Sequence, residues 1–173
     1  MDDQKYQIRL ARLEDIPYLP TIEQKASELF SGTENEIVAS LDCIPVEILL
    51  QQQEKGLVWV ASTEQGLPVG FAVVTVVDSS SHLEELSVDP LHGQRGLGTR
   101  LVDVVCDWAR TAGYRTLTLS TFRDVSWNAP FYKKIGFTEL SEERLGEEMR
   151  NLRIIEKEKG LDISARVIMI MTL

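Results

Sequence analysis

Hydrophobic and polar residues follow two different periods along the chain, and together they predict a mixed order of strands and helices. Strand-like segments occupy residues 6–10, 57–62, 69–78, 82–88, 116–122, 136–140 and 166–173. Helix-like segments occupy residues 14–30, 45–55, 99–112, 126–135 and 142–159. This order is typical of an α/β fold built around a strand, a glycine-rich turn and a helix.

The helix expected over residues 99–112 has the clearest apolar stripe. The stripe consists of Leu101, Val104, Val105, Trp108 and Ala112, and Gly113 closes the helix. The helix expected over residues 14–30 places Ile16, Leu19, Ile22 and Leu29 roughly on one face. Residues 142–159 have a helical pattern but are very polar.

Composition and charge narrow the class of protein. With 173 residues, 43% of them hydrophobic, the chain is expected to fold as one domain over residues 1–173. Its net charge of −9 argues against nucleic acid and anionic membranes as partners. We find neither a signal-peptide run at the N-terminus nor an apolar run of the roughly 20 residues that span a bilayer. Cys43 and Cys106 match neither metal nor disulfide spacing, as expected for a cytoplasmic protein.

A glycine-rich loop joins a predicted strand to the clearest helix. Residues 86–100 have the sequence L-S-V-D-P-L-H-G-Q-R-G-L-G-T-R. A helix that begins in such a loop presents unpaired N–H groups at its positive end, which suits a phosphate, and Gly96 and Gly98 let a ligand approach the backbone. Arg95 and Arg100 flank the loop, and residues 91–99 contain no acid. A plain strand-to-helix turn explains the glycines equally well, and the spacing matches neither the P-loop nor the dinucleotide fingerprint.

Three features together resemble the GNAT superfamily of acetyl-CoA-dependent N-acetyltransferases. They are V-D-P at residues 88–90 with the glycine loop, the helix and strand that follow, and N-A-P-F-Y-K-K-I-G-F at residues 128–137. The resemblance covers roughly residues 70–140. It implies a six- to seven-stranded, mostly antiparallel sheet, splayed at its centre, with helices on both faces. It also implies acetyl-CoA as cosubstrate and no metal.

The resemblance further implies a set of cosubstrate-binding residues. They are Leu86, Ser87, Val88, Gly93, Gln94, Arg95, Gly96, Leu97, Gly98, Thr99, Asn128, Tyr132 and Lys133. In such a site, the backbone of residues 86–88 pairs with the pantetheine arm and an N–H near Val88 steadies the oxyanion. Two positions depart from the family pattern: Gly93 replaces the usual Gln or Arg, and Val125 replaces an Asn.

The same resemblance assigns the catalytic groups. Strand alternation places His82 and Glu84 on one face and Glu85 on the other. Glu84 is the expected base for the amine, with His82 assisting or serving as the base itself. Tyr132 is the expected acid for the departing thiolate. Each has a structural alternative: His82 as an exposed residue at a strand start, Glu84 as a solvated carboxylate, Tyr132 as a core aromatic.

The implied reaction moves an acetyl group from acetyl-CoA to a primary amine of a small molecule, by direct attack in a ternary complex. Acids expected near the acceptor cleft suit a cationic amine or form a solvated face; these are Glu23, Glu28, Glu34 and Glu36. The polar helix over residues 142–159 fits either the cleft or a homodimer contact. Alternatives are acetylation of a protein N-terminus or lysine, and an inactive sensor that binds acyl-CoA.

Overall fold

The computed structural model describes residues 6–173 in two compact units. The first unit comprises the chain up to Thr75 together with Glu84–Asp107, and the second comprises Val76–Leu83 and Trp108–Leu173. The prediction of a single domain is not tested by this division and stays a prediction. Residues 1–5 lie outside the described residues. They belong to the N-terminal segment in which the sequence shows no signal-peptide run.

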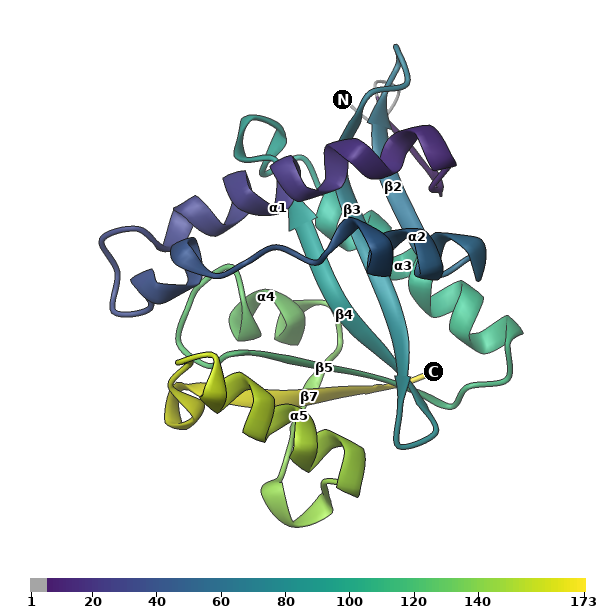
Figure 1. The fold of residues 1–173 in the computed structure, drawn as a ribbon. Helices are drawn as coiled ribbons and strands as arrows, with labels where there is room; N and C mark the ends of the chain where they lie inside the picture. The colour runs from purple at the N-terminus through teal and green to yellow at the C-terminus, as the bar shows by residue number, and fades with distance from the viewer. Residues whose placement is uncertain (1–5) are drawn as a thin grey trace. The chain divides into compact units, whose positions relative to one another are not determined.

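The first unit is built on antiparallel strands covered by helices. β1 (Tyr6–Leu10) pairs with β2 (Val58–Thr63), which pairs with β3 (Pro68–Val77). In Figure 1, α1 (Leu19–Ser27) and α2 (Val46–Glu54) lie in front of these strands and α3 (Leu97–Thr111) passes behind them. Apolar side chains of α1, of the 3₁₀ turn before it, of α2 and of the strands form one buried cluster, which includes Ile16, Leu19, Leu49, Val60 and Phe71. Burial of these side chains holds α1 and α2 on the sheet.

The second unit combines three strands with two helices. β5 (Thr116–Phe122) pairs antiparallel with β7 (Arg166–Thr172), which also pairs with β6 (Thr138–Leu140). The helices are α4 (Ala129–Lys134) and α5 (Glu147–Glu158), and α5 lies over β7 in Figure 1. A small core of Val77, Leu145, Met149 and Ile168 joins α5 and its preceding loop to the strands.

The strand β4 (Ser80–Val88) comes between β3 and β5 in the strand order. It pairs in parallel with β5 at Ser81–Leu117 and His82–Thr118. The strand order is β1-β2-β3-β4-β5-β7-β6. The predicted α/β architecture, a seven-stranded and mostly antiparallel sheet with helices, is therefore confirmed.

The helix predicted over residues 14–30 is wrong in detail. The segment divides into 3₁₀ turns at Leu13–Tyr18 and Glu28–Phe30, with α1 between them. Prolines at positions 17 and 20 explain the first break, because proline lacks the N–H that a continuous helix needs. The second 3₁₀ turn changes the helical phase, so Leu29 is 46% exposed while Phe30 is buried.

Other boundaries shift by a few residues. The helix predicted over residues 142–159 is a 3₁₀ turn, Glu142–Arg144, followed by α5. The serines at positions 80 and 81 belong to β4, because Asp78 and Ser79 make the hairpin turn with φ of 48° and 63°. Between residues 6 and 173, no helix is both long enough and apolar enough to cross a bilayer.

Candidate functional site

The glycine loop of the first unit has a backbone shaped for binding an anion. After β4, a 3₁₀ turn (Pro90–His92) leads into the loop, where Gln94 and Gly96 adopt positive φ of 57° and 75°. Helix α3 begins at Leu97, two residues earlier than predicted. The Arg100 N–H donates to the Gly96 carbonyl (3.0 Å), so a helical hydrogen bond of α3 reaches back into the loop. The first N–H groups of a helix have no partner within the helix and point outward at its positive end.

The side chains of the loop divide between exposed and buried positions. Gln94, Arg95 and Gly96 are exposed, whereas Leu97 is buried in the core and can offer a ligand only its backbone. A Cβ at Gly93 would lie 3.2 Å from the Pro90 carbonyl oxygen. The turn at Gly93 thus favours glycine at the position where the family usually has a longer residue.

An ion pair fixes the start of this loop. Lys25 Nζ lies 2.8 Å from Asp89 Oδ2, and Asp89 Oδ1 accepts the N–H of Leu91 (3.0 Å). Burial alone would raise the pKa of Asp89, but the hydrogen bonds from Lys25 and Leu91 and the charges of Lys25 and His92 lower it. The ionised carboxylate therefore connects α1 to the turn from which the loop departs. Lys25 was not predicted as a site residue, because no local pattern links residues separated by 64 positions.

The end of β4 presents the candidate base. Glu84 is exposed. Ser87 is buried, and its hydroxyl donates to Glu85 Oε1 (2.7 Å), which places these two residues on one face. Leu86 and Val88 are half-buried. The alternation predicted for this part of the strand, with Glu84 opposite Glu85, fits these contacts.

His82 belongs to the second unit and is buried, with 3% of its surface exposed. The interpretation of His82 as an exposed residue at a strand start is therefore wrong, because β4 begins at Ser80 and pairs with β5 there. His82 Nδ1 is hydrogen bonded to Thr118 Oγ1 (2.9 Å). Burial lowers the pKa of His82 to about 4, while the charge of Glu156 opposes this shift. The imidazole is therefore neutral at pH 7.

The motif at residues 128–137 contains α4 and belongs to the second unit. Asn128 precedes the helix, and its Oδ1 accepts hydrogen bonds from Thr121 Oγ1 (2.9 Å) and the Phe122 N–H (3.4 Å). This side-chain oxygen anchors α4 to the end of β5. Lys133 is exposed and lies 2.9 Å from Glu139 Oε1, so its charge is already partly balanced. Contact of either residue with a cosubstrate stays a prediction.

Tyr132 lies in an aromatic group. Its ring centroid is 5.0 Å from that of Phe131 and 5.5 Å from that of Phe137, both in edge-to-face geometry. The side chain is half-buried rather than enclosed. The aromatic contacts orient the ring without excluding catalysis by its hydroxyl. Because Glu84 and Tyr132 belong to different units, their meeting in one site also stays a prediction.

The described chain offers no cluster for a metal. Among residues 6–173, no three His, Cys, Asp or Glu side chains come together in a way that could hold a metal ion. Within the described part of the chain, Cys43 and Cys106 form no disulfide.

Comparison with known proteins gives the same family as the sequence motifs. The profile described as "Acetyltransferase (GNAT) family" matches residues 20–137. An uncharacterized N-acetyltransferase, YobR, from Bacillus subtilis is 30% identical over 72 residues. That match covers 42% of this chain and 29% of the relative. The chain therefore spans less than a third of the length of YobR.

Solved structures show the same fold at low identity. The PaiA N-acetyltransferase from Thermoplasma acidophilum, in complex with coenzyme A, has a TM-score of 0.75 at 17% identity, covering 97% of this chain and 99% of its own. The ribosomal-protein-S18-alanine N-acetyltransferase from Escherichia coli has a TM-score of 0.66 at 18% identity, covering 96% and 93%.

Proposed function

The chain belongs to the GNAT acetyltransferase family, and from this premise we propose that it transfers an acetyl group from acetyl-CoA to a primary amine of a small molecule. The observation that carries the proposal is the glycine loop. Its positive-φ residues lead directly into the N-terminus of α3, and Arg95 is exposed beside them. These groups fit a pyrophosphate, because backbone N–H donors and a helix dipole converge on one place. Coenzyme A is present in the similar structure from T. acidophilum.

The loop and the end of β4 bind different parts of acetyl-CoA. The N–H groups of Gln94, Gly96, Gly98 and neighbouring loop residues hold phosphate oxygens, with Arg95 adding positive charge. The backbone of residues 86–88 aligns the pantetheine arm. When bound, acetyl-CoA supplies an acyl thioester, whose carbon forms a bond to the amine nitrogen as its bond to sulfur breaks.

Glu84 is the better of the two candidate bases. A primary alkylamine is protonated at pH 7, so a group must take its proton before or during attack. Glu84 is exposed and can exchange that proton directly or through water. His82 is buried and its Nδ1 is hydrogen bonded to Thr118, so its imidazole is less accessible to an amine and to solvent than the Glu84 carboxylate. We assign proton removal to Glu84 and the orientation of the strand to His82, with Tyr132 delivering a proton to the leaving thiolate.

Two other functions stay open as alternatives. Acetylation of a protein N-terminus is favoured by the likeness to the S18-alanine N-acetyltransferase. An inactive acyl-CoA sensor is favoured by Gly93 and Val125, the two departures from the family pattern. The small-molecule reaction is preferred because Glu28, Glu34 and Glu36 are exposed in the segment that follows α1 and suit a cationic amine. Glu23 is half-buried, and its Oε2 accepts the N–H of Ile44 (3.0 Å).

Calorimetry with acetyl-CoA and CoA, followed by thiol release against small amines and peptides with free N-termini, tests the proposal. Glu84→Gln and Tyr132→Phe should each lower kcat by about a hundredfold or more while binding persists. Glu85→Gln and Tyr114→Phe are the matched controls, because Glu85 contacts Ser87 and Tyr114 packs on Trp108.

Each result has a definite meaning. Turnover on small amines that falls in both variants supports the proposal. Turnover confined to peptides favours the protein acetyltransferase, and tight binding without turnover favours the sensor. Absence of acetyl-CoA binding at high micromolar concentration contradicts the function as a whole.

A further inference from the structure

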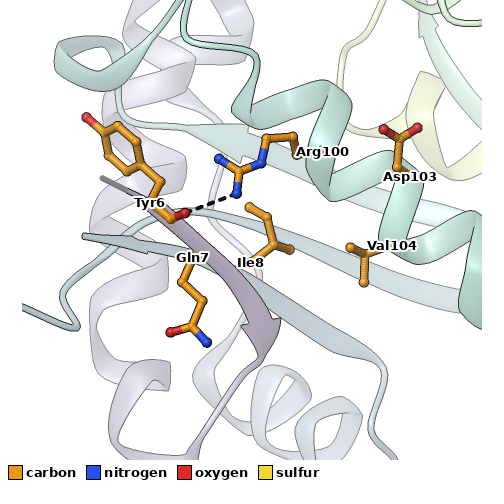
Figure 2. Close-up of a pocket in the computed structure, with 6 residues that line it drawn as sticks. All are labelled: Tyr6, Gln7, Ile8, Arg100, Asp103 and Val104. Atoms are coloured by element: carbon orange, nitrogen blue, oxygen red, sulfur yellow. Dashed lines mark hydrogen bonds between the residues drawn. The ribbon is translucent and has the colours of Figure 1, made fainter. Parts of the chain in front are cut away.

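Tyr6 lies on β1 and contacts three residues in or beside the glycine loop. Its hydroxyl is hydrogen bonded to His92 Nδ1 (2.9 Å), and the two rings meet edge to face with centroids 5.8 Å apart. The Arg95 guanidinium carbon lies 5.9 Å from the centre of the Tyr6 ring. The Tyr6 carbonyl accepts a hydrogen bond from Arg100 Nη2 (3.0 Å), at the edge of a hollow between β1 and α3 (Figure 2).

The three partners of Tyr6 bracket the loop. His92 ends the turn before it, Arg95 lies in its middle, and Arg100 belongs to the first turns of α3. Tyr6 itself is held by the sheet, since it is paired with Thr63 of β2. One half-buried residue thus connects β1 to the start, centre and end of the segment proposed to bind phosphate.

The loop needs such support from outside. Gln94, Arg95 and Gly96 are all exposed, so they bury little surface of their own. Gln94 also has a positive φ, which a residue with a side chain adopts at a cost. A loop with few buried contacts samples open conformations readily. Binding to it is then weaker, because ordering the donors subtracts from the binding free energy.

We propose that Tyr6 is a positioning residue, whose side chain holds the glycine loop in its binding conformation through His92 and Arg95, while its backbone carbonyl binds Arg100, without itself touching the cosubstrate. The proposal rests on the function proposed above, since it assigns the loop to acetyl-CoA. It adds a residue outside the family motifs, on a strand that precedes the loop by more than 80 positions.

Two substitutions separate the contacts of Tyr6. Tyr6→Phe removes only the hydroxyl bond to His92, and Tyr6→Leu also removes the ring beneath Arg95. We expect the Kd for CoA to rise about threefold to tenfold in the first variant and further in the second. The KM for acetyl-CoA should rise in parallel, with kcat at saturation nearly unchanged. Tyr18→Phe and Tyr18→Leu are matched controls, because Tyr18 is exposed in the 3₁₀ turn before α1.

A double-mutant cycle distinguishes positioning from general destabilisation. If the hydroxyl acts through His92, Tyr6→Phe should add little to the loss of CoA affinity caused by His92→Ala. Independent, additive losses, or Kd values in both Tyr6 variants equal to those of the Tyr18 controls, would overturn the proposal.

Amide hydrogen exchange of the ligand-free protein keeps the test independent of the proposed function. Faster exchange at residues 93–96 in Tyr6→Leu than in Tyr18→Leu supports the positioning role, and equal exchange overturns it. Failure of the native chain to bind CoA would instead contradict the proposed function, while the exchange comparison would still decide what Tyr6 does.

Discussion

Asp78 and Glu148 cap each other's backbone although 70 positions separate them. The Asp78 carboxylate accepts the N–H groups of Glu148 (3.0 Å) and Met149 (3.0 Å), and the Glu148 carboxylate accepts the N–H of Asp78. This is the reciprocal arrangement of a capping box, supplied by a hairpin turn rather than by the residue before the helix. It fastens the start of α5 to the turn between β3 and β4.

Loss of this cap should destabilise the protein. Asp78→Ala removes both acceptors for the first turn of α5, and we expect the free energy of unfolding to fall by about 1–2 kcal/mol in urea. Glu143→Ala, an exposed change in the preceding 3₁₀ turn, is the control and should have little effect. Gly146→Ala probes the same contact, because its Cβ would lie 2.2 Å from Asp78 Cγ. Native-like stability of both Asp78→Ala and Gly146→Ala would show that the cap contributes little.

The pair of Arg9 and Asp15 should make stability sensitive to acid. Burial alone would raise the pKa of Asp15, but hydrogen bonds from Arg9 and the Arg12 N–H, with the charges of Arg9 and Arg12, lower it. The pKa of Asp15 in the folded protein thus lies below its value of about 4 in the unfolded chain. The pair therefore contributes fully to the free energy of unfolding above about pH 4, and this contribution is lost as the pH falls through the folded pKa.

Asp15→Asn tests this dependence. At pH 7 we expect a loss of about 2–4 kcal/mol in the free energy of unfolding, because Arg9 Nη1 lies 2.5 Å from Asp15 Oδ2 and both side chains are largely buried. The difference from the native chain should narrow below about pH 4. Glu14→Gln, on an exposed side chain paired with Arg12, should change stability little at either pH. A deficit that stays constant down to pH 2 would contradict the assigned pKa direction.

His82 should contribute a second, separate pH dependence. Its folded pKa of about 4 lies below the unfolded value of about 6.5, so the unfolded chain binds the extra proton first. The neutral imidazole therefore makes its full contribution to the free energy of unfolding above about pH 6.5. Between pH 6.5 and 4 this contribution falls, by about 3 kcal/mol at most.

The His82 prediction is checked by NMR titration of the imidazole together with unfolding curves across that range. His82→Gln, which keeps a polar side chain beside Thr118, should flatten the dependence between pH 6.5 and 4. An imidazole signal that titrates near pH 6.5 in the folded protein would refute the prediction.

The Lys25–Asp89 pair should matter more for binding than for stability. Lys25 is 45% exposed, so Lys25→Met should reduce the free energy of unfolding by at most about 1 kcal/mol. Asp89 also caps the turn before the loop, so loss of its partner should weaken CoA binding severalfold. Calorimetry at low and high salt checks this, with Lys55→Met as the control. An unchanged Kd would show that Leu91 alone orients Asp89.

Local pattern was sufficient for several elements and for the outline of the site. The strand predicted over residues 116–122 coincides with β5. Of the stripe predicted for α3, Leu101 and Val105 are buried, whereas Val104 and Trp108 are half-buried and Ala112 is exposed beyond the end of the helix. The glycine loop also lies where the sequence places it, between β4 and α3. These features depend on backbone propensity and side-chain period over a few neighbouring residues, which the sequence displays directly.

Tertiary structure decided the rest. The burial of His82 depends on the pairing of β4 with β5, and the exposure of Leu29 depends on a 3₁₀ turn after α1. Tyr6 reaches the loop, and Asp78 reaches α5, across separations of 86 and 70 positions. Such contacts arise because collapse of the core brings distant polar groups within hydrogen-bond distance, and no period in the sequence encodes which of them will meet.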